Sequence, residues 1–381
     1  MKLAGILISQ LTPPGRGAVA SILVAGAGAI EFVGRHFSPA SGKSLSELPM
    51  GRVVFGTFRS LTDAAEEVVV GLHAADHVEI HCHGGAFAAA AVMKVLAKEG
   101  AAIIPWQQVA EHMEPNRIAA EARVALAAAR TEKTAAILLE QYQGALRTCV
   151  DDLATAIETQ AGSCPTSLAR LQRLLALAPL GMHLTQPWRV FIAGAPNVGK
   201  SSLMNALVGY QRSIIFDQPG TTRDLLTAVT ALDGWPLELV DSAGLRESTD
   251  ALEAAGVARA AAGLAAADLV LWVEDATETV SDVVARPRLC VGVDSLVVKN
   301  KADLLPVDTL PRSTTAVLVS ALSGQGLNQL CQRIVQQLVP APLSRGEAMA
   351  FTQRQEQSIR EAAAALAANK PDQAVAVLRS L

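Results

Sequence analysis

The sequence predicts an α/β fold whose central part is a mostly parallel sheet with helices on both faces. Residues 190–193 form a short apolar run, and after a glycine-rich turn apolar residues recur at helical spacing up to Gly209, which predicts strand, loop and helix. Strand and helix patterns then alternate from residue 188 to about residue 340. Residues 114–180 are instead rich in Ala, Leu, Glu, Gln and Arg, which favours helices.

Size and charge limit the possible functions. A chain of 381 residues allows two or three domains, and its net charge of -4 gives no global basic field, so any nucleic acid must be held by a local patch or by a partner. The apolar stretch at 260–273 contains Asp268 and is too short to span a bilayer, so we expect a cytoplasmic protein that does not enter the membrane. Five scattered cysteines without a C-x-x-C pair argue against a disulfide framework and a cysteine zinc site.

The segment before residue 110 is predicted to form a small α/β domain. Strand-like runs at 6–9, 18–24 and 78–80 are accompanied by a helix-forming stretch at 86–98. His81 and His83 flank Cys82 on the last of these strands, but the sequence shows no third metal ligand, so a structural role is favoured over a metal site.

The remaining elements follow from composition and turn residues. We expect two or three amphipathic helices between 114 and 180, a linker at 181–187, and a mostly helical segment at 351–381 that packs back on the middle helices. In the central part, Asp233-Gly234-Trp235 separates two strands that should form a hairpin. The strands expected there are 225–232, 236–241, 269–273, 296–298 and 316–319.

The central loop carries a phosphate-binding motif. Gly194 and Gly199-Lys200-Ser201 satisfy G-x-x-x-x-G-K-[ST], in which backbone N–H groups surround a polyphosphate at a helix N-terminus. Lys200 is expected to reach the β- and γ-phosphates as a catalytic group, and the Ser201 hydroxyl is expected to bind Mg²⁺. The nucleotide-contacting residues of this loop are Asn197, Val198, Gly199, Lys200, Ser201 and Ser202.

Later segments match the other parts of a GTP-dependent switch. Thr221 and Thr222 follow the first helix by a loop, where a threonine hydroxyl can complete the Mg²⁺ shell when a γ-phosphate is present. At the end of a strand, Asp241 can hold Mg²⁺ through water, and it is followed by the predicted phosphate-contacting residues Ser242, Ala243 and Gly244.

Guanine specificity is predicted from Asn300-Lys301-Ala302-Asp303. The carboxylate of Asp303 can accept the ring N–H and the exocyclic amine of guanine, a donor pair that adenine lacks. Backbone N–H groups of Ser320 and Ala321 are expected to close over the base. The order and strand-end placement of these motifs predict a P-loop, Ras-like G domain that binds GTP or GDP.

Two features concern hydrolysis. An amide oxygen from Asn197 between the phosphates can coordinate a monovalent cation, although a turn asparagine is the alternative interpretation. After Gly244 stands Leu245 in place of a water-orienting glutamine, so another group must orient the water. The nearby carboxylates are Glu247, Asp250 and Glu253.

The chain resembles the MnmE (TrmE) tRNA-modification GTPases. The signatures, in the family's order, are TPPGRG at 12–17, EIHCHGG at 79–85, GAPNVGKSSLMNAL at 194–207, PGTTRD at 219–224, DSAGLREST at 241–249, NKAD at 300–303 and FTQRQ at 351–355. The resemblance implies an N-terminal α/β folate-binding domain at 1–112, a helical domain at 113–186 and 342–381, and an inserted G domain at 187–341.

The resemblance also implies residue roles and partners. Ser201 and Thr222 would bind Mg²⁺, Glu253 would orient the attacking water, and Glu79 would contact 5-formyltetrahydrofolate. K⁺ would be held by Asn197, Phe216, Gln218 and Thr221. Family members form homodimers and act with the FAD protein MnmG on the wobble uridine of tRNA.

Some family features are absent. A family arginine is replaced by Leu23, which removes a cation partner for folate, and a terminal Cys-Ile-Gly-Lys motif is missing where the sequence reads Ser380-Leu381. These departures favour an alternative, a paralogue that keeps GTP switching and serves as a regulatory or assembly GTPase. A ribosome-assembly GTPase related to Era or Der is disfavoured because neither a KH-type segment nor a second P-loop is found.

Overall fold

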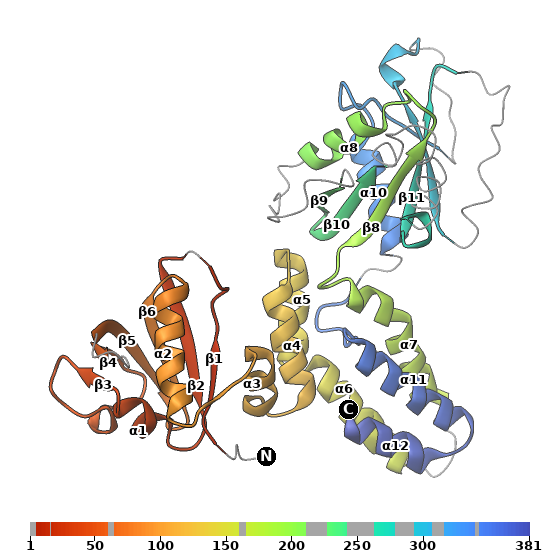
Figure 1. The fold of residues 1–381 in the computed structure, drawn as a ribbon. Helices are drawn as coiled ribbons and strands as arrows, with labels where there is room; N and C mark the ends of the chain where they lie inside the picture. The colour runs from red at the N-terminus through yellow and green to blue at the C-terminus, as the bar shows by residue number, and fades with distance from the viewer. Residues whose placement is uncertain are drawn as a thin grey trace, which may run out of the picture. The chain divides into compact units, whose positions relative to one another are not determined.

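The computed structural model describes most of the chain in two compact units, Met1–Val124 and Ala125–Leu381 (Figure 1). The residues that it describes are 5–15, 17–59, 65–159, 165–210, 227–241, 263–278, 293–306, 316–339 and 343–381.

The first unit is built on a seven-stranded sheet. Its strand order is β3-β4-β5-β6-β2-β1-β7, and every neighbouring pair is antiparallel except β1 and β7. The strands are β1 (Leu7–Gln10), β2 (Val19–Ala25), β3 (Phe37–Pro39), β4 (Val53–Arg59), β5 (Ala65–Ala74), β6 (His77–His83) and β7 (Ala102–Ile103). The predicted strands are present, and β3, β4, β5 and β7 are additional ones.

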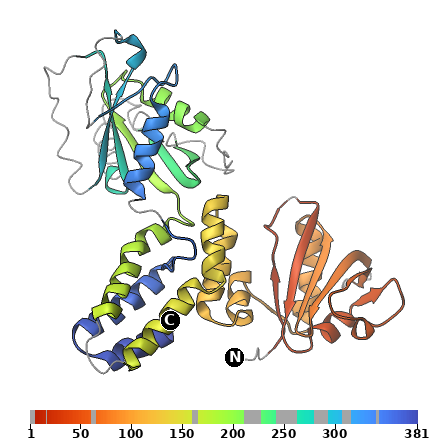
Figure 2. The ribbon, with the colours of Figure 1, turned by 180° about the vertical axis from the view of Figure 1, so that it is seen from behind.

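Side chains that alternate along these strands form two clusters on opposite faces of the sheet. On one face Ile22, Val24 and Ile80 pack with helices α1 (Ala29–Gly34) and α2 (Ala86–Lys98). On the other face Leu23 and Ala25 pack against Val109 of helix α3 (Trp106–Met113). Figure 2 shows α2 lying along the sheet. Helix α2 has the bounds that the sequence predicts.

In the second unit, helices come both before and after the strands of the sheet along the chain. Among the described residues, four helices precede the sheet, where two or three were predicted, and two more come after α10 (Leu327–Leu338). They are α4 (Arg117–Ala128, whose start belongs to the first unit), α5 (Glu132–Tyr142), α6 (Ala145–Thr159), α7 (Pro165–Met182), α11 (Gln353–Ala367) and α12 (Pro371–Ser380).

The C-terminal helices pack on the middle helices, as predicted. Helix α11 lies beside α7 and α12 beside α6 (Figures 1 and 2). Arg379 forms an ion pair with Glu158 at 3.0 Å, and Arg173 pairs with Glu347 at 2.7 Å. Segments about 200 residues apart in the sequence therefore form one helical layer.

The predicted linker at 181–187 is wrong at its start, because α7 continues to Met182. Gly181 is buried within this helix, and a Cβ there would lie 1.8 Å from the backbone oxygen of Ala350. The glycine therefore allows the segment around Ala350 to approach α7 closely. The composition of residues 181–187 does not reveal this contact.

The second unit's sheet has the order β13-β12-β11-β8-β10-β9, and all its neighbouring pairs are parallel except β10 and β9. Its elements are β8 (Trp188–Gly194), α8 (Lys200–Gly209), β9 (Thr227–Leu232), β10 (Trp235–Asp241), β11 (Leu269–Asp275), β12 (Ser295–Asn300), β13 (Ala316–Leu318) and α10 (Leu327–Leu338). The predicted hairpin is β9–β10, although Trp235 belongs to the second strand rather than to the turn.

The parallel strands of the second sheet define where a ligand can bind. Because β8, β10, β11, β12 and β13 are parallel, their carboxyl ends lie at one edge of the sheet, where ligands bind in such folds. Among the described residues, no helix is long and apolar enough to cross a bilayer.

Candidate functional site

The phosphate-binding motif forms the connection between β8 and α8, as predicted. Two glycines bring this loop close to neighbouring backbone and side chains. A Cβ at Gly194 would lie 2.2 Å from the Val273 oxygen of β11, and one at Gly199 would lie 2.4 Å from Asn300 Nδ2. Gly199 also has a φ of +90°, a conformation that side-chain-bearing residues rarely adopt. Glycine is therefore required at both positions.

Lys200 begins helix α8 and is nearly buried. Its Nζ donates a hydrogen bond to the backbone oxygen of Ala195 at 2.8 Å, so the side chain turns back across the loop. The ammonium group thus lies inside the turn that the motif predicts for phosphates, next to the N-terminus of a helix, where anions are favoured.

Ser201 and Asp241 form the oxygen pair at the edge of the sheet. Asp241 ends β10 and is fully buried, and the Ser201 hydroxyl donates to its Oδ2 at 2.6 Å. Hydroxyl and carboxylate oxygens are ligands that suit Mg²⁺, which in nucleotide sites also binds phosphate oxygens and water. The structure therefore brings together two of the predicted magnesium-site residues.

Asn300 connects the phosphate loop to the predicted base-binding loop. It ends β12 and is 2% exposed. Its Nδ2 donates to the Val198 oxygen at 3.0 Å, and its Oδ1 accepts from the Ala321 N–H at 3.0 Å. The prediction placed Asn300 at the guanine base, whereas its described hydrogen bonds hold two loops together. The Ala321 N–H donates to Asn300 in this structure, and its contact with a guanine base stays a prediction.

The segment after Asn300 turns sharply into a short 3-10 helix, η5 (Ala302–Leu304). Lys301 has a φ of +67°, and its Nζ forms an ion pair with Asp275 Oδ2 at 2.6 Å. Burial raises the pKa of Asp275, but hydrogen bonds from Lys301 and Thr277 outweigh it, so the pKa lies below its usual value. Asp275 thus stays ionised and anchors Lys301, while Asp303 remains exposed at the same edge of the sheet.

The Ser320 loop is fixed by its own backbone. Ser320 is fully buried, its N–H donates to the Gln325 oxygen at 2.9 Å, and its Oγ accepts from the Ser323 N–H at 3.1 Å. These bonds hold Ala321 next to Asn300, which places the predicted base loop beside the phosphate loop.

Asn197 occupies the tip of the phosphate loop. It is exposed and has a φ of +62°, a conformation that asparagine adopts more readily than most residues. A turn residue and a cation ligand both fit this geometry. Of its neighbours in the predicted set, Val198 is buried and Ser202 is exposed.

Several predicted site residues lie outside the described residues. They are the K⁺ and Mg²⁺ candidates Phe216, Gln218, Thr221 and Thr222, the phosphate-contacting Ser242, Ala243 and Gly244, and the carboxylates Glu247, Asp250 and Glu253.

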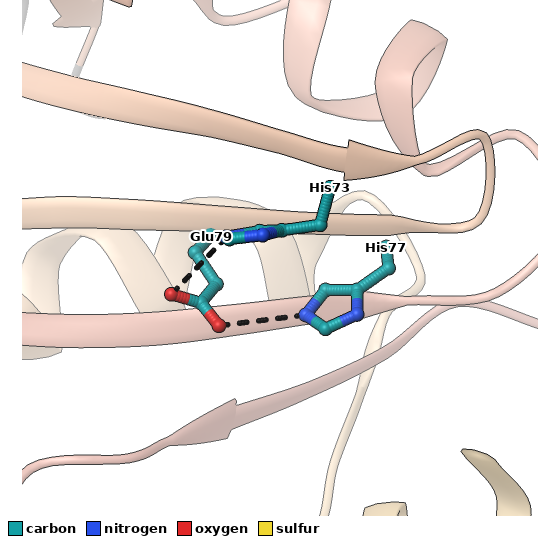
Figure 3. Close-up of side chains that lie close together, drawn as sticks. All are labelled: His73, His77 and Glu79. Carbon is teal, nitrogen blue, oxygen red and sulfur yellow. Dashed lines mark ion pairs between the residues drawn. The ribbon is translucent and has the colours of Figure 1, made fainter. Parts of the chain in front are cut away.

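Glu79 lies in the first unit, beside His73 and His77, a group that was not predicted from the sequence (Figure 3). Of the two histidines singled out in the sequence, His81 belongs to this group, whereas His83 pairs with Glu66 at 2.7 Å, and Cys82 between them is buried in the core. The alternation of His77, Glu79 and His81 at every second residue of β6 was the available signal for this group.

Comparisons with known proteins agree with this site. Residues 189–301 match the family model described as 50S ribosome-binding GTPase. The tRNA modification GTPase MnmE of Moorella thermoacetica is 34% identical and covers 85% of this chain and 79% of its own length. The protein of the same name from Synechococcus sp. (strain CC9605) is also 34% identical, covering 94% of this chain and 87% of its own length.

A solved structure is similar to part of the chain. The G domain of the FeoB iron transporter of T. maritima is 25% identical and covers 40% of this chain and 99% of its own, with a TM-score of 0.28. A score this low supports no detailed structural comparison.

Proposed function

Because the chain belongs to the MnmE family of tRNA modification GTPases, we propose that it couples GTP hydrolysis to modification of C5 of the wobble uridine in tRNA. The observation that carries this proposal is 34% identity over 94% of the chain, which reaches far beyond the nucleotide site. Such coverage favours tRNA modification over a paralogue that has kept only the GTP switch.

The chain is a GTPase, and its described residues divide the work of binding and hydrolysis. Lys200 neutralises charge on the β- and γ-phosphates from within the loop. Ser201 directly and Asp241 through water would hold Mg²⁺, which would offset the charge that develops on the phosphates. Asp303 accepts hydrogen bonds from the ring N–H and the exocyclic amine of guanine. Asn300 links the base loop to the phosphate loop through its hydrogen bonds with Ala321 and Val198.

The cation and the attacking water are assigned by family resemblance. Asn197, Phe216, Gln218 and Thr221 bind K⁺, where its charge replaces that of an arginine finger, and Glu253 orients the water. The exposed, left-handed Asn197 at the tip of the loop is compatible with this assignment, as it is with a turn residue.

We expect GTP turnover to fall on the order of 10²-fold when K⁺ is replaced by Na⁺, because the transition state then loses a charge held at a fixed position. A Glu253→Ala variant should show a similar or larger loss, on the order of 10²–10⁴-fold, since the water is no longer oriented. Steady-state phosphate release measures both effects, with Glu361→Ala, at an exposed position of α11, as the matched control that retains its rate. Equal rates in K⁺ and Na⁺, or full activity of Glu253→Ala, would contradict this mechanism.

The remaining assignments concern architecture and partners. We propose the division into a folate-binding-type domain at 1–112, a helical domain at 113–186 and 342–381, and a G domain at 187–341. A homodimer acting with an MnmG-like FAD protein on tRNA in the cytoplasm fits this family. Folate binding through Glu79 is the assignment with the least support. Leu23 lies directly opposite Glu79 on β2 and carries no charge, where the family has an arginine.

The function is tested in a strain that lacks this protein. Mass spectrometry of its tRNA is expected to show loss of C5-aminomethyl-type groups from wobble uridines, because no other step in the proposed reaction replaces GTP-driven modification. Expression of the wild-type chain should restore them, whereas a Lys200→Ala chain should not. Unchanged wobble uridines in the deletion strain would refute the proposed substrate while leaving the GTPase activity standing.

A further inference from the structure

A histidine-rich cluster lies on one face of the first unit's sheet. His77, Glu79 and His81 occupy alternate positions of β6, so their side chains share a face. It is the face on which Leu23 and Ala25 of β2 pack with α3, because these two residues are the register partners of Glu79 and His77.

His73 joins the cluster through an irregularity in β5. The pairing of β5 with β6 shifts between Leu72 and Ala74, and such a bulge redirects a side chain. Gly71 lies opposite Glu79, and a Cβ there would come within 3.1 Å of His73 Nε2. The absence of a side chain at Gly71 leaves room for the His73 ring to reach Glu79.

The imidazole nitrogens of His73 and His77 both lie near the carboxylate oxygens of Glu79 (Figure 3). His73 Nε2 lies 3.5 Å from Glu79 Oε2, and His77 Nε2 lies 3.4 Å from Glu79 Oε1. Both exceed the usual N–H···O distance, and the buried His77 Nε2 has no hydrogen-bond partner among the described residues. Each distance is close to the separation of two ligand atoms at a tetrahedral zinc ion, about 3.3 Å for Zn–N bonds near 2.0–2.1 Å, and the two imidazoles face different oxygens of the carboxylate.

His81 supports the carboxylate from the neighbouring position. Its Nδ1 lies 2.8 Å from Ser21 Oγ, and its Nε2 lies 3.6 Å from Glu79 Oε2. Ser21 is also its register partner on β2. This arrangement fixes the imidazole behind the carboxylate, as outer groups around metal ligands commonly do.

We propose that His73, His77 and Glu79 bind one divalent transition-metal ion of the Zn²⁺ class, with His81 as a positioning residue. Two imidazoles and one carboxylate suit such ions better than Mg²⁺ or Ca²⁺, which prefer oxygen ligands. No lysine or arginine forms an ion pair with Glu79 in the described part of the chain, so its charge is available to the metal. His73 is half exposed, which leaves a route for exchange and an open fourth position.

Zinc binding to the full chain tests the proposal. Titration against a chromophoric chelator is expected to give one Zn²⁺ per chain for the wild type, and Co²⁺ should produce the visible absorption of a low-symmetry site. His73→Gln and His77→Gln should each weaken binding at least about tenfold, since even outer-shell losses at metal sites cost that much. His83→Gln is the matched control, because His83 lies on the same strand but pairs with Glu66.

Thermal unfolding with and without Zn²⁺ distinguishes loss of metal binding from loss of folding. Thermal unfolding of each variant without metal verifies folding, and added Zn²⁺ should raise the Tm of the wild type but not of His77→Gln. Binding weaker than about 1 mM in the wild type, or equal affinity in all three variants, overturns the proposal. His73→Gln also separates it from folate binding, because the folate assignment rests on Glu79 and not on His73.

Discussion

A Lys200→Ala variant is expected to hydrolyse GTP about 10²–10³-fold more slowly than the wild type, the usual loss when one preorganised charge partner of a transition state is removed. Lys200 is nearly buried, and its hydrogen bond to the Ala195 oxygen holds the ammonium inside the phosphate loop. Alanine leaves the γ-phosphate charge without this partner. Single-turnover phosphate release at saturating GTP measures the effect.

The comparison needs variants that separate charge from shape. Lys200→Arg keeps the charge, but the planar guanidinium does not fit the position of a compact ammonium, so we expect little recovery. Lys370→Ala, an exposed lysine at the start of α12, is the matched control and should retain full activity. A Lys200→Ala variant that folds, binds nucleotide and turns over at the wild-type rate would remove Lys200 from the mechanism.

An Asp303→Asn variant is expected to bind GDP on the order of 10²–10⁴-fold more weakly, because it loses two hydrogen bonds to a charged acceptor, each worth about 1.5–3 kcal/mol. The amide that replaces the carboxylate donates where guanine also donates. Xanthine carries a carbonyl at that position, so affinity for xanthosine diphosphate should rise. Calorimetric titration with the diphosphates of guanosine, adenosine and xanthosine measures the change.

The control for this experiment is another exposed aspartate. Asp372→Asn, in the first turn of α12, makes the same chemical change far from the nucleotide in sequence and should leave all three affinities unchanged. Asp303 is itself exposed, so its substitution should not alter the free energy of unfolding. Equal affinity of Asp303→Asn and the wild type for GDP would show that guanine is recognised elsewhere.

The nucleotide site was largely predictable because its residues are close in sequence to strand ends. Gly199, Lys200 and Ser201 form one turn, and Asp241 and Asn300 each end a strand that apolar runs identify. Parallel pairing then places these ends at one edge of the sheet. The bridging role of Asn300 was not predictable, because its partners Val198 and Ala321 are 102 and 21 residues away in the sequence.

The helical region shows where composition misleads. The sequence predicted a linker from Gly181 to Pro187, yet α7 continues through Gly181 to Met182, where the segment around Ala350 packs closely against the helix. Tertiary packing outweighs the local helix propensity of single residues. The number of helices before the sheet was underestimated although α5 has a local start signal, since the Thr131 side chain accepts a hydrogen bond from the Thr134 N–H.

The amino-acid sequence by itself determined the phosphate loop, the strand–helix alternation around it and the family, because these are read from local spacing and motifs along the chain. Only the tertiary structure decided which side chains face Glu79. Strand register, the shift beside Gly71 and the space left by that glycine bring His73 and His77 to one carboxylate, and register is fixed by pairing between strands rather than within one.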